Sequence, residues 1–383
     1  MKKYLLLLAF ALVMLSSKAT GHYVLHTWTY GGLSREYYLY VPSSYDSTKP
    51  MPFVLVLHGL GDTISNFIGI NMNLVADTGN FIFAVPQAIT DPTFGYSAWN
   101  SGTGYLGIQL NPTVDDVGFL NAIIDSTQAY YNLDQTRLYC TGFSMGGFMT
   151  NRLGCELNNR IAAIASVSGT IGTYLTCNPT RVVPACHFHG TNDQVVYYTG
   201  DMFGMDPEVL VAYWRAHDGC DSVPIIDTLP KVIPDTLTFI HYIYPNGEYG
   251  SDVEFYKVVN GTHEWIYEPN MNYSVAIWQF FYKHKWVPQV NAINEVPVTV
   301  DMKIFPNPAN DALNIEYTPN GLTTQPELMI TDLTGRVVFK SELSVSQGTQ
   351  QIETKNWAAG SYTYNVRNNE NGVVVRGIFV VAH

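Results

Sequence analysis

The stretch RLYCTGFSMGGFMT, residues 137–150, decides the fold. Residues 142–146 match the pattern G-x-S-x-G, which places a serine on a sharp turn between a strand and a helix. Residues 138–140 predict the incoming strand, and residues 148–157 predict the outgoing helix. The glycines suit such a turn because neighbouring backbones approach too closely for side chains. We therefore predict that Ser144 lies exposed above a sheet; the alternative is a glycine-rich loop without a chemical role.

A nucleophilic serine needs a base and an acid that orients the base. In α/β-hydrolases these follow the serine in the order acid, then histidine. Asp193 and His263 occur in that order, each in a loop after a predicted strand, where open α/β sheets place their chemistry. We predict a triad of Ser144, Asp193 and His263. Asp201 and Asp206 are the alternative acids.

A hydrolytic serine also needs N–H groups aimed at the developing oxyanion, each worth about 2.7–4 kcal/mol of transition-state stabilisation. Residues 58–61, His-Gly-Leu-Gly, follow the first buried strand and predict a tight turn. We predict that a backbone amide of this turn and the amide of Met145 form the oxyanion hole.

An uninterrupted apolar run at residues 52–59 is typical of a parallel strand buried on both faces. The alternation of strands with helices along residues 35–286 predicts a mostly parallel α/β sheet with helices on both faces. Together with the serine turn at residues 142–146, this indicates an α/β-hydrolase fold. Similar runs occupy 81–87, 137–142, 162–169 and 185–191, and helical patterns occupy 115–131, 207–217 and 272–284.

Composition excludes some functions. The net charge is −12 and charged residues are only 14% of the chain, so a protein that binds nucleic-acid phosphates through a basic face is not expected. No zinc-ligand pair is evident. The predicted serine chemistry requires neither a metal nor an organic cofactor.

Residues 1–19 predict a signal peptide, with two lysines first, an apolar stretch at 5–15 and a small-x-small cleavage site at 17–19. A membrane anchor is the alternative, but the apolar stretch is short for a bilayer. We expect a secreted mature protein without a membrane span. The chain has five cysteines, so at least one is unpaired. Cys140 and Cys186 lie in apolar runs and predict buried thiols; the bridge partners come from Cys155, Cys177 and Cys220, whose pairing the sequence leaves open.

The chain changes character after Trp286. Residues 20–286 carry the predicted catalytic domain, and residues 287–303 lack a helical period and predict a linker. From residue 304 to 383, short β-type runs alternate with turn residues about every ten positions, which predicts a small β-sandwich.

The aromatic residues that fall in or beside the strand-end loops include Trp99, Tyr197 and Trp265. We predict that they wall the substrate pocket, where they would suit a planar acyl group or sugar rings. Ordinary packing is the alternative in a chain with 13% aromatic residues.

Residues 33–286 resemble the secreted polyhydroxybutyrate-depolymerase and feruloyl-esterase-like hydrolases. The resemblance implies the same nucleophile, acid and base as above, and oxyanion amides at Leu60 and Met145. The family often has x-W-P after the catalytic histidine, whereas Glu264-Trp265-Ile266 lacks the proline. The motifs that carry the resemblance are HGLGD (58–62), WNSG (99–102), VDDVGFLNAIID (114–125), GFSMGGFMTNRLGCE (142–156), HFHGTNDQVVYY (187–198) and NGTHEW (260–265).

The tail resembles the C-terminal sorting domain of the type IX secretion system of Bacteroidetes, through IFPNPANDALNIEY (304–317), DLTGRVV (332–338) and AAGSYTYNV (358–366). This resemblance implies that the type IX machinery is a partner and that the protein is exported across the outer membrane. A carbohydrate-binding sandwich is the alternative.

The sequence therefore predicts a secreted serine carboxylesterase. Its ester substrate, polymeric or oligomeric, stays open among polyhydroxyalkanoates, feruloyl esters and acetyl esters of plant polysaccharide. A serine peptidase of the same fold and a non-enzymatic surface protein are the alternative functions.

Overall fold

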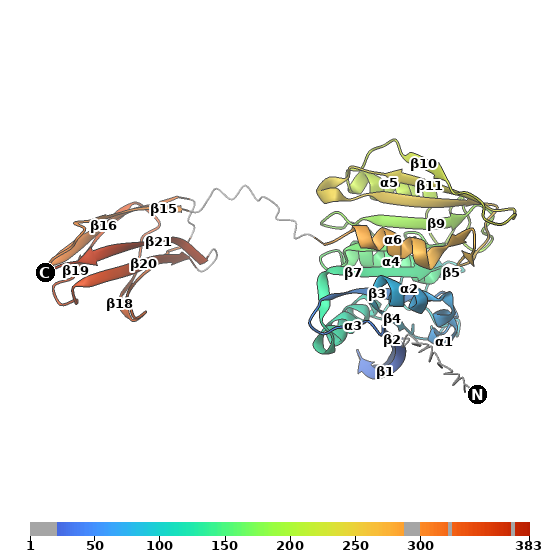
Figure 1. Cartoon of the computed structure of the whole chain (residues 1–383), viewed down its shortest axis with the longest axis horizontal. Helices are drawn as coiled ribbons and strands as arrows, with labels where there is room; N and C mark the ends of the chain where they lie inside the picture. Colours follow the sequence, from blue (N-terminus) through green and yellow to red (C-terminus); the bar gives the residue numbers. More distant parts are fainter. Residues whose placement is uncertain (1–20, 287–298, 321–323, 369–371) are drawn as a thin grey trace, which may run out of the picture. The chain divides into compact units, whose positions relative to one another are not determined.

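The computed structural model describes residues 21–286, 299–320, 324–368 and 372–383. The chain divides into two compact units, residues 1–289 and 290–383 (Figure 1). The predicted signal peptide lies outside the described residues, as do residues 287–298 of the predicted linker.

The first unit is built on a ten-stranded mixed sheet with the order β1-β2-β4-β3-β7-β8-β9-β12-β11-β10. The central neighbours from β4 through β12 pair in parallel, and the outer strands on both sides pair antiparallel. The predicted α/β-hydrolase fold with a mostly parallel core is confirmed. The strands are β1 (His22–Tyr30), β2 (Leu33–Val41), β3 (Met51–Leu57), β4 (Ile82–Pro86), β7 (Leu133–Phe143), β8 (Ala163–Val167), β9 (Ala185–Gly190), β10 (Ile225–Thr228), β11 (Thr238–Tyr244) and β12 (Val253–Val259).

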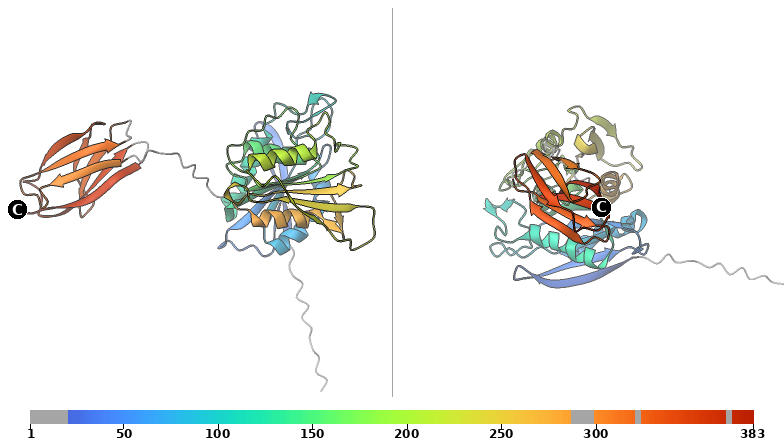
Figure 2. Two further views of the ribbon diagram at one scale, coloured as in Figure 1. Left: turned by 90° about the horizontal axis from the view of Figure 1, so that it is seen from above. Right: turned by 90° about the vertical axis from the view of Figure 1, so that its left-hand side faces the viewer.

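Helices cover both faces of this sheet. α3, α4 and α5 contribute to one hydrophobic core and α1, α2 and α6 to another, and Figure 2 shows α5 and α6 on opposite sides of the sheet. Among the described residues, every helix is too short or too polar to serve as a membrane-spanning segment. The helices are α1 (Ile64–Phe67), α2 (Met72–Gly79), α3 (Asp116–Tyr130), α4 (Met145–Glu156), α5 (Pro207–His217) and α6 (Tyr273–Lys283), with 3₁₀ turns η1 (Ile68–Ile70) and η2 (Glu248–Gly250).

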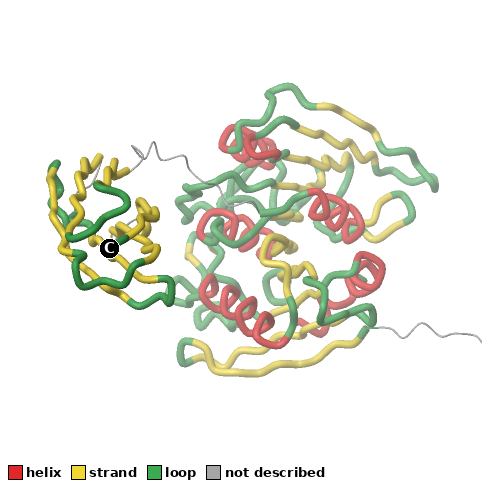
Figure 3. The backbone as a smooth tube through the Cα atoms, turned by 60° about the vertical axis from the view of Figure 1, so that its left-hand side comes forward, coloured by secondary structure: helices red, strands yellow, loops and turns green. Residues whose placement is uncertain are grey.

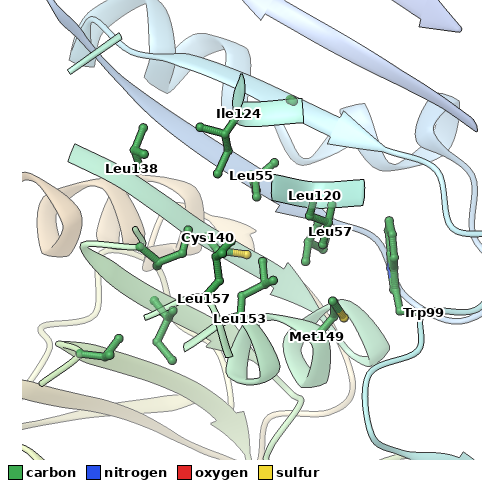
Figure 4. Packing of buried hydrophobic residues seen from close by; sticks show 14 of the residues in the cluster. Leu55, Leu57, Trp99, Leu120, Ile124, Leu138, Cys140, Met149, Leu153 and Leu157 are labelled. Carbon is green, nitrogen blue, oxygen red and sulfur yellow. The ribbon is translucent and has the colours of Figure 1, made fainter. Parts of the chain in front are cut away.

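Strand β3 shows why its sequence is apolar at every position. Phe53, Leu55 and Leu57 point into the core beneath α3 and α4, whereas Val54 and Val56 point into the core on the other face. Successive side chains of a strand alternate between faces, so a strand covered on both sides needs apolar residues throughout. Figure 4 shows the first of these cores, with Leu55 and Leu57 among side chains of α3 and α4.

The two edges of the sheet were not part of the sequence prediction. β1 and β2 form a long hairpin at one edge, visible at the bottom of Figure 3. Gly31 and Gly32 join these strands, and both have positive φ, as a tight two-residue turn requires. β10 lies at the other edge with all four residues exposed, so it has no apolar alternation that would mark it as a strand. Two short hairpins complete this unit, β5 (Gly104–Tyr105) with β6 (Ile108–Gln109) and β13 (Tyr267–Glu268) with β14 (Met271–Asn272).

The second unit is all β, as predicted, and its two sheets share one core. β15 begins at Thr299, inside the stretch predicted as linker. Val300 is buried and Met302 and Ile304 pack beside it, an alternation that the prolines nearby obscured. The sheets are β15 (Thr299–Phe305), β16 (Ala312–Asn320) and β19 (Gly348–Glu353), and β18 (Val337–Glu342), β17 (Glu327–Asp332), β20 (Gly360–Asn368) and β21 (Gly372–Val381).

The cysteine pairing that the sequence left open is resolved. Cys155, near the end of α4, is bridged to Cys177 in the loop after β8, with Cα atoms 5.1 Å apart. Cys140 and Cys186 are buried free thiols, as predicted, and Cys220 is a third.

Candidate active site

Ser144 lies on the turn between β7 and α4, with φ 53° and ψ −120°. Residues other than glycine rarely adopt such values, and holding one there costs about 1–3 kcal/mol. The turn is held in place because the Ser144 N–H donates to the Val167 carbonyl at 2.8 Å, and the Ser144 carbonyl accepts from Gly147 at 2.8 Å.

The glycines around Ser144 allow backbone segments to touch. A Cβ on Gly142 would lie 2.4 Å from the Gly146 carbonyl oxygen, and a Cβ on Gly146 would lie 2.1 Å from that of Leu57. A Cβ on Gly169 would lie 2.2 Å from the Ser144 carbonyl oxygen. Because backbone atoms cannot move aside easily, any side chain at these positions would displace the turn that presents Ser144.

Ser144 and His263 line the same pocket, which has a volume of about 480 Å³. This size is within the range of pockets that bind small molecules. The pocket is mainly apolar, and its lining residues are Gly59, Leu60, Gly61, Asp62, Thr103, Gly104, Tyr105, Phe143, Ser144, Met145, Phe148, Val195, Val196, Phe203 and His263.

His263 and Asp193 are directly joined: His263 Nδ1 lies 2.7 Å from Asp193 Oδ2. The other oxygen, Oδ1, accepts from the amides of Val195 and Val196, each at 2.9 Å. Asp193 is only 2% exposed, and this burial raises its pKa, but the hydrogen bond and charge of His263 and the amide donors outweigh burial. The net pKa of Asp193 is therefore lowered, and the carboxylate is ionised at neutral pH.

The two loops that carry Asp193 and His263 follow neighbouring parallel strands, β9 and β12. They are tied together where the Asn192 N–H donates to the Gly261 carbonyl and the Asn260 N–H donates to Thr191 Oγ1, both at 2.9 Å. His263 Nε2, the nitrogen opposite Asp193, has no hydrogen bond within the part of the chain that the structure describes.

The alternative acids have other partners. Asp201 accepts hydrogen bonds from the amides of Tyr197 and Phe203 in its own loop. Asp206 caps the N-terminus of α5 by accepting from the amides of Glu208 and Val209. Both carboxylates therefore organise local backbone.

The two predicted oxyanion donors, Leu60 and Met145, both line the pocket with Ser144. Met145 is the first residue of α4, where a helix leaves its N–H groups without intrahelical partners and carries a partial positive charge. Among the described residues, neither amide N–H has a hydrogen-bond acceptor. Both amides are thus available to an anionic oxygen.

His58 holds the loop that carries Leu60. Its Nδ1 lies 2.7 Å from the Gly59 carbonyl, which can only accept, so Nδ1 carries the proton. Its Nε2 then accepts from the Ala88 N–H at 3.1 Å. Burial lowers the pKa of His58, so the ring stays neutral, as this pattern requires. The indole of Trp99 also donates to the His58 carbonyl, at 3.0 Å.

None of the three predicted pocket aromatics is among the lining residues. Trp99 is 0% exposed and lies in the same core as Leu57, where its indole donates to the His58 carbonyl in the loop that carries Leu60 (Figure 4). Tyr197 is 48% exposed. Trp265 donates through Nε1 to Ser274 Oγ at 3.1 Å.

The aromatic walls come instead from Tyr105, Phe143, Phe148 and Phe203. Tyr105 and Phe203 stack nearly parallel, with ring centroids 6.5 Å apart. Thr103 Oγ1 donates to the Phe203 carbonyl at 2.7 Å, so the loops after β4 and β9 form one wall. No local pattern marks Tyr105 or Phe203; their position in loops after strand ends is the signal that could have pointed to them.

The described residues contain no group of three or more histidine, cysteine, aspartate or glutamate side chains that could hold a metal ion. The polar groups of this site are the Ser144 hydroxyl, an imidazole paired with a carboxylate, and two backbone amides without acceptors among the described residues. This set can support nucleophilic attack on a carbonyl carbon.

Comparison with known proteins gives two family matches. Residues 44–205 match the phospholipase/carboxylesterase family. Residues 303–380 match the secretion system C-terminal sorting domain.

A bifunctional acetylxylan esterase/xylanase of Neocallimastix patriciarum is 34% identical over 170 residues, which make up 44% of this chain and 22% of that protein. Feruloyl esterase B of Piromyces equi is 30% identical over 197 residues, 48% of this chain and 35% of that protein. The chain therefore spans a minor part of the length of both relatives. Among solved structures, an acetyl xylan esterase from Aspergillus awamori has 16% identity and a TM-score of 0.48, over 68% of this chain and 99% of that one.

The ten-stranded sheet with helices on both faces and the turn at Ser144 agree with the first family match. Residues 44–205 are thus similar to the phospholipase/carboxylesterase family, and residues 303–380 are similar to the secretion system C-terminal sorting domain.

Proposed function

We propose that the protein is a serine carboxylic ester hydrolase that acts through Ser144, His263 and Asp193. The observation that carries this proposal is the 2.7 Å contact between His263 Nδ1 and Asp193 Oδ2 beside a serine held at φ 53° in the same pocket. The family match over residues 44–205 and the esterase relatives support it.

In this mechanism His263 Nε2 accepts the proton of Ser144 as the hydroxyl oxygen attacks the ester carbonyl. The amides of Leu60 and Met145 stabilise the negative oxygen of the tetrahedral intermediate. The imidazolium then gives its proton to the leaving alcohol, which produces an acyl-enzyme on Ser144. Water, deprotonated by the same imidazole, releases the acid. Asp193 keeps the proton of neutral His263 on Nδ1 and stabilises the imidazolium.

We further propose that the preferred substrate carries a planar aromatic acyl group, as in feruloyl esters of plant polysaccharide. Four aromatic residues wall a pocket of about 480 Å³, far more space than an acetyl group needs. Aromatic rings gain about 0.5–1.5 kcal/mol from stacking beyond the area they bury. Acetyl esters and hydroxybutyrate oligomers would leave much of this wall without contacts.

A substrate panel tests this preference. We expect kcat/KM to be higher for methyl ferulate than for acetylated xylan or hydroxybutyrate oligomers. Phe203→Ala should lower kcat/KM for methyl ferulate by about 3- to 10-fold through loss of ring stacking, and leave that for p-nitrophenyl acetate nearly unchanged. Equal loss of both activities in Phe203→Ala would contradict an acyl site at Phe203. Cleavage of peptides by the wild type in preference to all esters would contradict the esterase assignment.

We propose that residues 304–383 direct the protein through the type IX secretion machinery to the cell surface or medium. The sorting-domain match over residues 303–380 supports this localisation. The signal peptide predicted at residues 1–19 would provide the preceding step across the inner membrane.

Deleting residues 304–383 is expected to leave the esterase activity of the purified protein unchanged, because the described pocket residues all lie in the first unit. The same deletion should prevent export from a type IX-competent host, measured as activity in medium and cell-surface fractions. Normal export combined with lost binding to insoluble polysaccharide would instead identify the tail as a carbohydrate-binding domain.

A further inference from the structure

A row of buried polar groups leads to Asp193, and its three side chains, Ser166, His187 and His189, are not among the residues that line the pocket. Ser166 Oγ is 2.7 Å from His187 Nδ1, and His187 Nε2 is 3.1 Å from His189 Nδ1. His189 Nε2 is 2.9 Å from the Val196 carbonyl oxygen. Ser166, His187 and His189 are each no more than 3% exposed, so these side chains are shielded from solvent. The mechanism above uses none of them.

The protons of this row follow from its last member. The Val196 carbonyl can only accept, so His189 Nε2 carries a proton. Burial lowers the pKa of both histidines, well below the usual value for His187, so each ring is neutral and holds one proton. His189 Nδ1 must then accept from His187 Nε2, and His187 Nδ1 must accept from the Ser166 hydroxyl. Each group in the row therefore donates its hydrogen bond to the next one, from Ser166 to Val196.

The row ends at the candidate acid. The Val196 N–H donates to Asp193 Oδ1 at 2.9 Å, while the carbonyl of the same residue accepts from His189. His189 Nε2 also lies 3.5 Å from Asp193 Oδ2, the oxygen that contacts His263. Asp193 Oδ2 therefore lies between two imidazole rings, only one of which reaches the pocket.

We propose that His189 is a positioning residue for the triad: the donor chain Ser166–His187–His189–Val196 holds the loop of Asp193 so that Oδ2 faces His263. This inference rests on the proposed function. A misplacement of about 1 Å at a reacting group can cost a hundredfold in rate, so a fixed donor behind the acid affects turnover without touching substrate.

The proposal is tested with His189→Phe and His189→Gln in the full chain. Phenylalanine keeps a ring but removes the donor to Val196, and kcat for p-nitrophenyl acetate should fall by roughly 10- to 100-fold with little change in KM. Glutamine can place an amide N–H near the position of Nε2, and it should recover most of that loss.

A double-mutant comparison separates positioning from stability. In the Asp193→Asn background, His189→Phe should cost almost nothing further in kcat, although it should lower Tm by the same amount as in the wild type. His241→Gln is the control. It alters a histidine on β11 that pairs with Glu254 on β12, and it should lower Tm without lowering kcat. If His189→Phe does not fold, His187→Phe makes the same comparison one link further from Asp193, with a smaller loss of kcat.

Wild-type kcat in His189→Phe, or an equal fold-loss in both backgrounds, would overturn the positioning role. These outcomes are distinct from a failure of the proposed triad, which would appear as an Asp193→Asn enzyme with nearly wild-type activity.

Discussion

Replacing Ser144 with alanine is expected to reduce kcat for p-nitrophenyl acetate by about 10⁶-fold, the scale on which loss of the nucleophile disables a serine hydrolase triad. The proposed oxyanion amides at Leu60 and Met145 would remain, so a small residual rate is expected. The circular dichroism spectrum should not change, because the turn is held by backbone hydrogen bonds to Val167 and Gly147 and not by the hydroxyl group.

Ser144→Gly is the matched control for this variant. It also lacks the hydroxyl group, so it should be equally inactive. Glycine adopts φ 53° without strain, so the glycine variant should be more stable than the alanine variant by about 1 kcal/mol, measured by thermal or denaturant unfolding. Activity within a few-fold of the wild type in either variant would contradict Ser144 as the nucleophile.

Replacing Asp193 with asparagine is expected to lower kcat by up to about 10⁴-fold. The carboxylate only accepts hydrogen bonds, and it therefore keeps the proton of neutral His263 on Nδ1, 2.7 Å away. An amide can present N–H groups at the same place, which favours the opposite tautomer and leaves Nε2 unable to accept the proton of Ser144. The loss should appear in kcat for both acetyl and feruloyl esters, since Asp193 is not among the pocket-lining residues.

Combining Asp193→Asn with His263→Ala tests how the acid acts. The double variant should be barely slower than His263→Ala alone, because groups that act as a unit are strongly non-additive. If the two losses multiplied, Asp193 would act on another part of the molecule. Asp201 and Asp206 would not replace it, because their carboxylates already accept from backbone amides elsewhere.

The fold could be predicted from the sequence because its signals are local. Strands such as β3 are apolar at each position since helices cover both faces, and Asp206 and Pro207 mark the start of α5 directly. The triad was predicted for a related reason: parallel strands end at one edge of the sheet, so residues in successive strand-end loops converge there. The roles of the three residues stay predictions until variants are measured.

The walls of the pocket could not be predicted in the same way. Tyr105 and Phe203 are far apart in sequence and meet only because the loops after β4 and β9 are tied together by Thr103. Trp99 lies in a strand-end loop, as a pocket aromatic would, but its indole donates to the His58 carbonyl in the core. An aromatic residue in a strand-end loop can face either way, and long-range contacts decide which.

The donor chain Ser166–His187–His189–Val196 could not be predicted from the sequence either. His187 and His189 are two positions apart on β9, so their side chains start on the same face of the strand, but nothing local shows that Ser166 and Val196 complete the row. Cysteine pairing posed a similar difficulty, since no local pattern shows which of Cys155, Cys177 and Cys220 are joined, and the packing of the loop after β8 against α4 brings the first two together.

The central claim is that catalysis passes through an acyl group on Ser144, and its most direct test is mass spectrometry of the enzyme during turnover. The protein should be mixed with excess p-nitrophenyl acetate, quenched in acid within the first turnovers and digested. We expect one added acetyl group per chain, on the peptide that contains Ser144, and a higher fraction of it in Asp193→Asn if deacylation slows more than acylation. Active enzyme with no adduct, or with its adduct on a residue other than Ser144, would contradict the account.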